Sequence, residues 1–252
     1  MNLPPIVTRE AWLEARKALL EEEKAFTRAK DRLNALRRQL PMVEVTADYT
    51  FEGPDGRVEL GELFEGRAQL IVYHFMFDPS WDQGCPGCTF LVDNIGKLDR
   101  LYEGNTSLAL VSRAPLEKLE RYREERGWSL PWYSSYGSEF NYDFHVTIDH
   151  SRGPQQYNYR PARDPSNDWD GSSIELPGHS VFLRDGDRIF HTYSTYQRGA
   201  DLLLTAYNYL DLTPLGRQEP FEEEWNRRAA AGELSRRDRV GAPHGASGRI
   251  RE

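Results

Sequence analysis

The chain has 252 residues, of which 38% are hydrophobic and 29% are charged, and its formal net charge is −8 at pH 7. The length predicts one enlarged domain with appendages. The negative charge argues against a protein that binds nucleic acid through a basic face. No apolar run approaches the roughly 20 residues that a membrane-spanning helix needs. The first ten residues show no secretory signal, and with two cysteines in all this favours a cytoplasmic protein without membrane attachment.

Residues 8–40 are predicted to form one long helix, as the main part of an N-terminal extension over 1–42. Large apolar residues recur at every seventh position and form a narrow stripe on a charged helix: Trp12, Leu19, Phe26, Leu33 and Leu40. A stripe of this kind needs a partner. We expect it to pack either on the rest of its own chain or on a second subunit, so a homodimer is one of the two options.

Alternating strands and helices follow, which favours an α/β sandwich. Residues 51–60 predict a hairpin that turns at Gly53-Pro54-Asp55-Gly56. The apolar run 68–75 predicts a central strand buried on both faces. The later elements are, in chain order, a helix whose apolar face is Leu91, Ile95, Leu98 and Tyr102, a strand over 107–112, and a helix from Pro115 to about Arg126 that Gly127 ends.

Residues 128–176 interrupt this alternation as a long insertion. Its first part, 128–144, is rich in Trp, Tyr and Phe. These aromatic residues predict either a cover that completes the core or an apolar wall over a binding site. Its second part, 151–176, is polar and predicts a long loop.

The chain then predicts a hairpin of strands 180–184 and 188–193 around Asp185-Gly186-Asp187. A final helix is expected over 201–210. Residues 216–252 form a charged tail, with a short helix over 221–231 and disorder beyond Gly232.

The two cysteines are three positions apart in Cys85-Pro86-Gly87-Cys88, between the strand 68–75 and the helix that follows it. This is the carboxyl end of a strand, where open α/β sheets bind ligands. A helix that begins at this motif places Cys85 just before its first free N–H groups, which lowers the thiol pKa below the ordinary value of about 8.5. We therefore expect Cys85 to be the exposed nucleophile and Cys88 the resolving thiol.

The chain resembles the thioredoxin superfamily, and more closely a bacterial branch known as domain-of-unknown-function family 899, described as predicted dithiol-disulfide oxidoreductases. The resemblance covers about residues 5–215. It is carried by Tyr73-His74-Phe75-Met76-Phe77, Gly84-Cys85-Pro86-Gly87-Cys88, Asp93-Asn94, Phe140-Asn141-Tyr142-Asp143-Phe144 and His191-Thr192-Tyr193-Ser194.

This resemblance implies a thioredoxin-like three-layer sandwich over 43–215, with the N-terminal helix and the aromatic insertion added to it. It also implies reduction or oxidation of a disulfide in a small molecule or a protein, with an external electron donor. No glycine-rich phosphate-binding motif is present, so no nucleotide or flavin cofactor is expected.

Ordinary thioredoxins have a Trp directly before the first cysteine and Gly-Pro between the two. Here Gly84 precedes Cys85, Trp81 lies four positions upstream, and the middle pair is Pro86-Gly87. The middle residues help to set the redox potential, so the resemblance does not fix the direction of the reaction.

The superfamily also places a cis-proline opposite the cysteines and a buried acid beneath the second one. Pro177 is the candidate for the proline, and His179 follows it closely. Asp78 and His74 are the candidates for the buried group.

Two other functions compete with the oxidoreductase. A thiol peroxidase is the first, but the Pro-x-x-x-Thr/Ser-x-x pattern before a peroxidatic cysteine is absent, because Asp78 and Asp82 hold those positions. The second is a non-catalytic protein that binds a thiol or a metal. A zinc site would need two ligands beside the cysteines. His179 or His191 could approach, although a structural role for the histidines is favoured.

Overall fold

The computed structural model describes residues 4–162 and 173–219. By its internal contacts the chain divides into a larger unit, residues 6–205, and a smaller one, residues 1–5 and 206–252. Helix α6 (Thr205–Leu210) begins at the border of the two. The helix predicted over 201–210 starts later than expected, because residues 197–203 form a 3₁₀ helix instead. The predictions for the tail beyond residue 219 lie outside the described residues.

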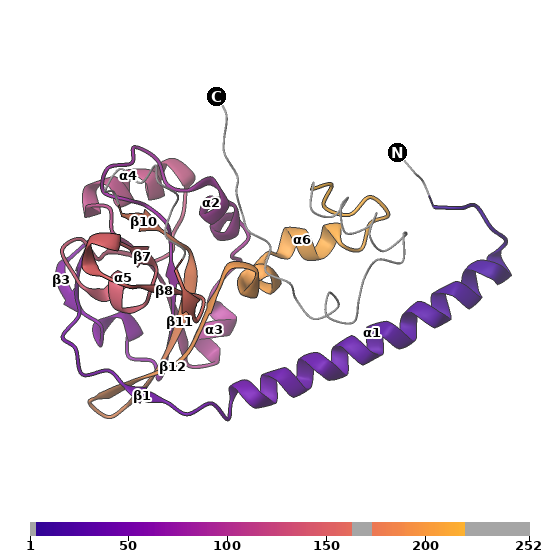
Figure 1. Ribbon diagram of the computed structural model, residues 1–252, viewed down its shortest axis with the longest axis horizontal. Coiled ribbons are helices and arrows are strands. Elements are labelled where there is room, and N and C mark those ends of the chain that lie inside the picture. The colour runs from indigo at the N-terminus through magenta and orange to yellow at the C-terminus, as the bar shows by residue number, and fades with distance from the viewer. Residues whose placement is uncertain (1–3, 163–172, 220–252) are drawn as a thin grey trace. The chain divides into compact units, whose positions relative to one another are not determined.

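A mixed sheet of eight strands forms the centre of the larger unit (Figure 1). The strands lie in the order β1-β12-β11-β4-β5-β6-β2-β3. β4, β5 and β6 are parallel, whereas β11 and β12 are antiparallel to their neighbours. Their bounds are β1 (Val43–Glu44), β2 (Thr50–Gly53), β3 (Gly56–Glu59), β4 (Gln69–His74), β5 (Thr106–Ser112), β6 (Trp132–Ser134), β11 (Gly178–Asp185) and β12 (Arg188–Tyr196).

A hydrophobic core covers each face of this sheet, because side chains of a strand alternate between its two faces. Leu70 and Val72 of β4 belong to one core, and Tyr73, with Phe75 just beyond the strand, belongs to the other. The first core includes residues of η1 (Glu62–Phe64) and α5 (Phe140–Asp143), and the second includes residues of α2 (Pro86–Asp93) and α4 (Leu116–Arg126). The predicted three-layer α/β sandwich is confirmed.

The helix predicted after the cysteines is shorter than its apolar face suggests. α2 ends at Asp93, and α3 (Asp99–Glu103) follows as a separate short helix. At the break the Asn94 side chain donates a hydrogen bond to the carbonyl of Phe90 at 2.7 Å. Asparagine competes with helical backbone bonds in this way, and Gly96 adds a residue of low helix propensity, so the helix stops.

The aromatic segment 128–144 completes the core. Trp132 lies in β6, pairs with β5 and is 1% exposed, and its ring lies 4.7 Å from that of Phe75. Phe140 is fully buried on the opposite face. Of the two interpretations of this segment, the cover for the core is the one the structure supports.

The region predicted as a long loop contains short elements where it is described. They are β7 (Thr147–Ile148), η2 (His150–Arg152), β8 (Gln156–Tyr157), β9 (Arg160–Pro161) and β10 (Ile174–Glu175). β10 pairs with β7, and β8 pairs with β9. Pairing between such short segments has no periodic signal in the sequence, which is why it was not predicted.

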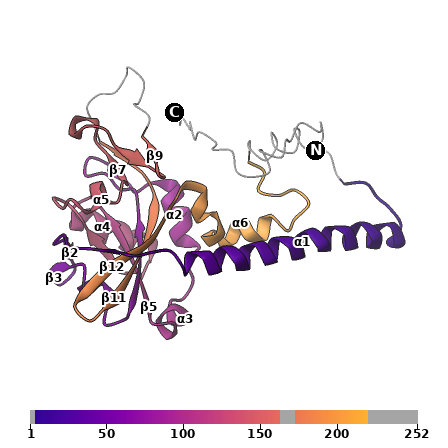
Figure 2. The same ribbon diagram turned by 60° about the horizontal axis from the view of Figure 1, so that its bottom comes forward.

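Figure 2 shows the predicted hairpin of β11 and β12. It turns at Gly186, whose φ of +61° suits glycine. β11 also pairs with β4, so that Gly178 lies opposite His74 and His179 opposite Tyr73. This register brings the start of β11 to the carboxyl end of β4, from which the chain continues to the cysteines.

The N-terminal helix α1 (Arg9–Arg37) is capped by Thr8, which accepts a hydrogen bond from the Ala11 N–H at 3.3 Å. Its stripe is not covered by the described part of the chain, since Trp12, Leu19, Phe26 and Leu33 are 46, 54, 63 and 45% exposed. The described part of the chain therefore gives no support to packing of the stripe on its own domain, and a second subunit stays a prediction. Among the described residues no helix is both long and apolar enough to cross a membrane.

The double substitution Leu19→Asp with Phe26→Asp tests this remaining alternative. We expect it to lower the molecular mass measured by light scattering while the far-ultraviolet circular dichroism of the sandwich stays unchanged. The reason is that each added carboxylate would have to be buried in a helix–helix seam at a cost of several kcal/mol. An unchanged mass in the double variant would show that the stripe is not a subunit contact.

Candidate active site

Cys85 and Cys88 lie at the start of α2, at the carboxyl end of β4. Cys85 is the residue before the first helical turn, Pro86 occupies the first helical position, and Cys88 lies within the turn. Proline suits that position because its missing N–H would have no helical partner there and its fixed φ is already helical. Both thiols are free, Cys85 is partly exposed, and Cys88 is buried.

The environment of Cys85 favours its thiolate. The pKa of Cys85 is lowered to about 6, chiefly by the hydrogen bond from the Cys88 thiol and further by the backbone N–H groups of Cys88 and Gly87, while burial opposes the shift. These donors belong to the first turn of α2, where N–H groups lack helical partners. Near neutral pH Cys85 is therefore mostly ionised.

Cys88 has the opposite properties. It is 2% exposed, and burial raises its pKa well above the ordinary value. The N–H of Met76 donates to its sulfur at 3.4 Å, and the Tyr73 hydroxyl forms a second hydrogen bond with it. Cys85 is thus the more exposed and the more acidic of the two thiols, as the sequence analysis predicted.

A cavity of about 150 Å³ opens beside the two cysteines. Pro177, Gly178 and His179 line it together with Cys85 and Cys88, so the segment predicted to face the cysteines does so. The predicted cis bond at Pro177 is wrong, since none of the described residues follows a cis peptide bond. The trans form is the more stable one by about 0.5–1 kcal/mol. Here the Pro177 carbonyl accepts a hydrogen bond from the Tyr157 hydroxyl at 2.8 Å.

His179 contributes a buried, neutral imidazole to the cavity wall. Its ring stacks on Tyr73 with 4.5 Å between centroids, and it is 4% exposed. Burial lowers its pKa to about 4, so the ring is uncharged near neutral pH. His179 therefore presents an uncharged ring to the cavity.

Trp81 does not line the cavity. It packs on the hydrophobic core that contains Cys88, and its carbonyl accepts a hydrogen bond from the Lys118 ammonium at 2.7 Å. The position directly before Cys85 has no room for a tryptophan. A Cβ on Gly84 would lie 2.7 Å from the Phe75 ring, closer than any side chain tolerates. The departure from ordinary thioredoxins at this position thus has a packing cause.

Neither candidate for the group beneath Cys88 occupies that place. His74 forms a hydrogen bond with the Ser180 hydroxyl at 2.8 Å, and Asp78 belongs to a separate polar network. Tyr73, which the sequence analysis missed as a site residue, holds the place instead. It lies on the same face of β4 as Phe75, so the alternation along the strand was the signal that could have identified it.

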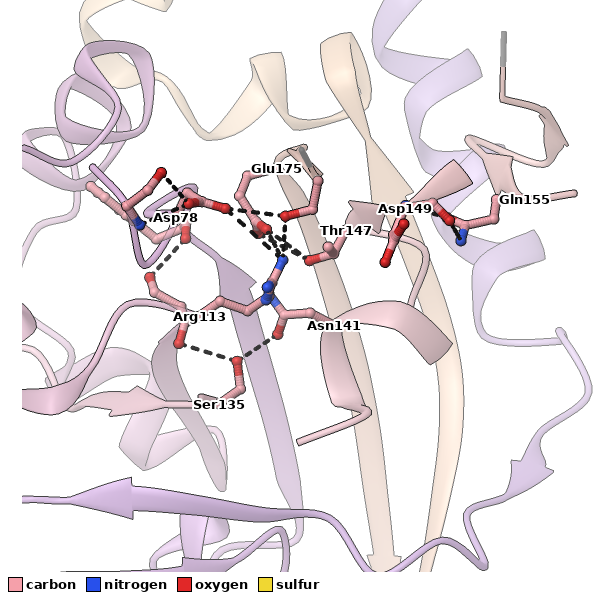
Figure 3. A network of polar contacts seen from close by, with 12 residues as sticks. Asp78, Arg113, Ser135, Asn141, Thr147, Asp149, Gln155 and Glu175 are labelled. Atoms are coloured by element: carbon pink, nitrogen blue, oxygen red, sulfur yellow. Dashed lines mark hydrogen bonds and ion pairs between the residues drawn. The ribbon is translucent and has the colours of Figure 1, made fainter. Parts of the chain in front are cut away.

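The separate network joins four segments around a buried ion pair (Figure 3). The Arg113 guanidinium donates to Glu175 at 2.7 Å and to the Ser173 hydroxyl at 2.9 Å, and Ser173 donates to Asp78 at 3.2 Å. Thr147 donates to both oxygens of Glu175. Burial raises the pKa of Glu175 to about 7, against the opposing charge of Arg113. The network connects the loop before Cys85 to the segment before Pro177.

Among residues 4–162 and 173–219, no three His, Cys, Asp or Glu side chains gather closely enough to hold a metal ion. His191, one of the two histidines considered as zinc ligands, instead bonds to the Ser194 hydroxyl at 2.8 Å. The described part of the chain therefore gives no support to a zinc site at the cysteines.

The acidity of Cys85 can be measured through its alkylation by iodoacetamide. We expect the rate of Cys85 labelling to rise with pH to half its maximum near pH 6, because only the thiolate reacts and the pKa is lowered to about 6. Cys88 should label more slowly than Cys85 throughout this pH range, since burial raises its pKa. Peptide mapping by mass spectrometry distinguishes the two, and faster labelling of Cys88 at pH 7 would reverse the assigned roles.

Comparison with known proteins gives one family and several solved structures. The family model described as "Bacterial protein of unknown function (DUF899)" matches residues 1–231. No curated protein is significantly similar to the chain in sequence.

The similar structures include a variant of Xanthomonas campestris peroxiredoxin Q, with 15% identity over 68% of this chain and 98% of that chain and a TM-score of 0.42. Peroxidoxin BcpB from Mycobacterium tuberculosis has 17% identity over 68% and 97%, with a TM-score of 0.40. The apo Sco1 protein of Thermus thermophilus has 21% identity over 61% and 84%, with a TM-score of 0.34.

Proposed function

The chain belongs to the bacterial family of unknown function DUF899, and we propose that it is a dithiol-disulfide oxidoreductase with Cys85 as the nucleophile and Cys88 as the resolving thiol. The observation that carries this proposal is the asymmetry of the pair. One thiol is acidic and partly exposed beside a cavity, and the other is buried and protonated behind it. The substrate is a disulfide in a small molecule or a protein, and reducing equivalents come from an external donor.

The reaction begins with the Cys85 thiolate, which attacks one sulfur of a substrate disulfide. A Cys85–substrate disulfide forms, the substrate S–S bond breaks, and the second substrate sulfur leaves as a thiolate. This step uses the ionised form, which the hydrogen bond from Cys88 and the N–H groups of α2 stabilise.

Cys88 then loses its proton to the departing thiolate and attacks the Cys85 sulfur. The Cys85–Cys88 disulfide forms and the remaining substrate sulfur leaves as a thiolate. The substrate has gained two electrons and the cysteine pair has lost them, and an external dithiol restores the pair. Hydrogen bonds from Tyr73 and from the Met76 N–H stabilise the Cys88 thiolate while it attacks.

A thiol peroxidase is the second candidate, because an acidic thiolate with a neighbouring thiol can also reduce a peroxide. Cys85 would attack the peroxide oxygen and break the O–O bond, and Cys88 would condense with the resulting sulfenic acid and release water. One of the similar solved structures is named a peroxiredoxin and another a peroxidoxin. The residue three positions before Cys85 is Asp82, however, where a peroxidase has a Thr or Ser hydroxyl for its peroxide.

Turnover of the purified protein with 2-hydroxyethyl disulfide and with hydrogen peroxide, each with dithiothreitol as the donor, separates the candidates. We expect the disulfide to be reduced well above the uncatalysed rate and the peroxide to be consumed at a much lower rate. Faster consumption of peroxide would make the protein a peroxidase. Inactivity with both substrates, together with cysteines that never form a disulfide, would remove the redox function.

A further inference from the structure

We propose that the cavity beside Cys85 selects disulfides that carry an uncharged apolar group of about the size of a benzene ring, and that it disfavours disulfides that carry a carboxylate. This inference rests on the proposed oxidoreductase function and names its substrate class. The group in question is the one attached to the sulfur that Cys85 attacks.

The walls of the cavity are mostly apolar. Met76, Leu91, Pro177, Ala200 and Leu204 line it around the two sulfurs. The volume is about 150 Å³, and an apolar cavity of that volume takes up a benzene-sized molecule. Burying an aromatic ring of this size contributes on the order of 2 kcal/mol. An apolar group can therefore be held next to the Cys85 sulfur during the attack.

One wall comes from the 3₁₀ helix η3 (Gln197–Leu203) and Leu204, which fold back over the sheet after β12. The return needs two unusual backbone positions. Gln197 has a φ of +49°, and a Cβ on Gly199 would lie 2.0 Å from the Thr195 hydroxyl. Only glycine allows so close an approach. Gln197 and Gly199 therefore provide the backbone conformation that places this wall beside the cysteines.

The charges around the cavity disfavour an anion. None of the described residues that line it is Lys or Arg, and the imidazole of His179 is neutral. Asp201 supplies a carboxylate, whose charge is offset in part by the ion pair with Arg198 at 2.8 Å. The Cys85 thiolate adds a second negative charge. Like charges at about 4 Å repel by roughly 1–4 kcal/mol between bulk water and a protein surface.

Two probe disulfides of nearly equal size test the proposal. The first joins a benzyl thiol to 2-mercaptoethanol, and the second has a carboxylate at the para position of the ring. The reduced protein is mixed with each probe at pH 7, and the rate of Cys85–Cys88 disulfide formation is divided by the rate of the same probe with free dithiothreitol. We expect this normalised rate to be at least about tenfold higher for the benzyl probe.

Variants at Ala200 connect the preference to the cavity. Ala200→Phe fills the space and should abolish the preference, whereas Ala200→Lys adds a cation and should raise the rate with the carboxylated probe. Leu203→Phe is the matched control, because Leu203 belongs to the same 3₁₀ helix, is 48% exposed and does not line the cavity. It should keep the wild-type preference, and near-ultraviolet circular dichroism shows whether each variant is folded.

The failure of this proposal can be distinguished from the failure of the proposed function. If both probes oxidise the cysteine pair at equal normalised rates, or if both Ala200 variants keep the wild-type preference, the cavity does not select the substrate and the oxidoreductase function stands. If neither probe nor 2-hydroxyethyl disulfide oxidises the pair, the oxidoreductase function is wrong and the substrate class falls with it.

Discussion

Replacing Cys85 by serine should lower disulfide turnover by a factor on the order of a thousand or more. A serine hydroxyl is almost entirely protonated near neutral pH, whereas the Cys85 thiol, with its pKa lowered to about 6, is mostly ionised. The buried Cys88 cannot replace it, because its pKa is raised and its sulfur is 2% exposed. The measurement is the initial rate of 2-hydroxyethyl disulfide reduction with dithiothreitol as the donor.

The companion substitution Cys88→Ser has a different expected result. Cys85 should still attack the substrate, but no second thiol is left to break the Cys85–substrate disulfide, so this intermediate should accumulate. Intact-mass spectrometry should show one substrate thiol bound per chain in Cys88→Ser and none in Cys85→Ser. Cys88→Ala, unlike Cys88→Ser, leaves no side-chain donor at this position and so loses the hydrogen bond that contributes most to the acidity of Cys85. The pKa of Cys85 should therefore rise, and its labelling profile should shift to higher pH.

The two cysteine variants contradict the assigned roles if they exchange their behaviour. Accumulation of the adduct in Cys85→Ser would make Cys88 the nucleophile. Full turnover by Cys88→Ser would show that external thiol, and not Cys88, resolves the intermediate. As a control, both variants should melt at the same temperature as the wild type. The changes in turnover are then due to the missing thiol and not to unfolding.

The local features of the site could be predicted from the sequence, because they depend on neighbours along the chain. The order of strand, Cys85-Pro86-Gly87-Cys88 and helix predicts which thiol is acidic, since the free N–H groups always lie at the start of a helix. The position of the segment from Pro177 to His179 was implied by the resemblance to the thioredoxin superfamily together with the hairpin that follows it, and the segment lies beside β4.

Features that depend on contacts across the fold could not be predicted. Asp78 and His74 were chosen as partners of Cys88 because they are close in sequence, yet the contact is made by Tyr73, whose side chain lies on the face of β4 that packs against α2. The ion pair of Arg113 and Glu175 joins residues 62 positions apart. It depends on the pairing of β7 with β10, two-residue strands that carry no periodic pattern.

Removing one partner of that ion pair should destabilise the protein strongly. We expect Glu175→Ala to lower the free energy of unfolding by about 3–5 kcal/mol, because it leaves the Arg113 charge buried without its carboxylate. The side chains of Arg113 and Glu175 are 16% and 2% exposed, so little solvent replaces the lost contact. Asp78 compensates only in part, since its carboxylate lies 4.0 Å from the guanidinium, against 2.7 Å for Glu175. Urea denaturation at pH 8, followed by tryptophan fluorescence, measures the difference.

The double variant Arg113→Met with Glu175→Leu separates the cost of an unpaired charge from the value of the pair. Apolar residues of similar size remove both charges together, so we expect the double variant to be more stable than Glu175→Ala by at least about 2 kcal/mol. Arg152→Met is the matched control, because Arg152 forms its ion pair with Glu139 at the surface, and it should change stability by less than about 1 kcal/mol.

The same variants should slow disulfide reduction because they displace the sides of the cavity, and not because they change the pKa of Cys85. Asp78 precedes Cys85 in its loop and Glu175 precedes Pro177, so the network holds two sides of the cavity in place. In the stable double variant we therefore expect slower disulfide reduction with an unchanged pH for half-maximal Cys85 labelling, because no member of the network bonds to either sulfur in the described structure. A labelling profile shifted along the pH axis would instead mean that Arg113 and Glu175 set the acidity of Cys85. A double variant with a free energy of unfolding as low as that of Glu175→Ala would show that the ion pair itself stabilises the fold.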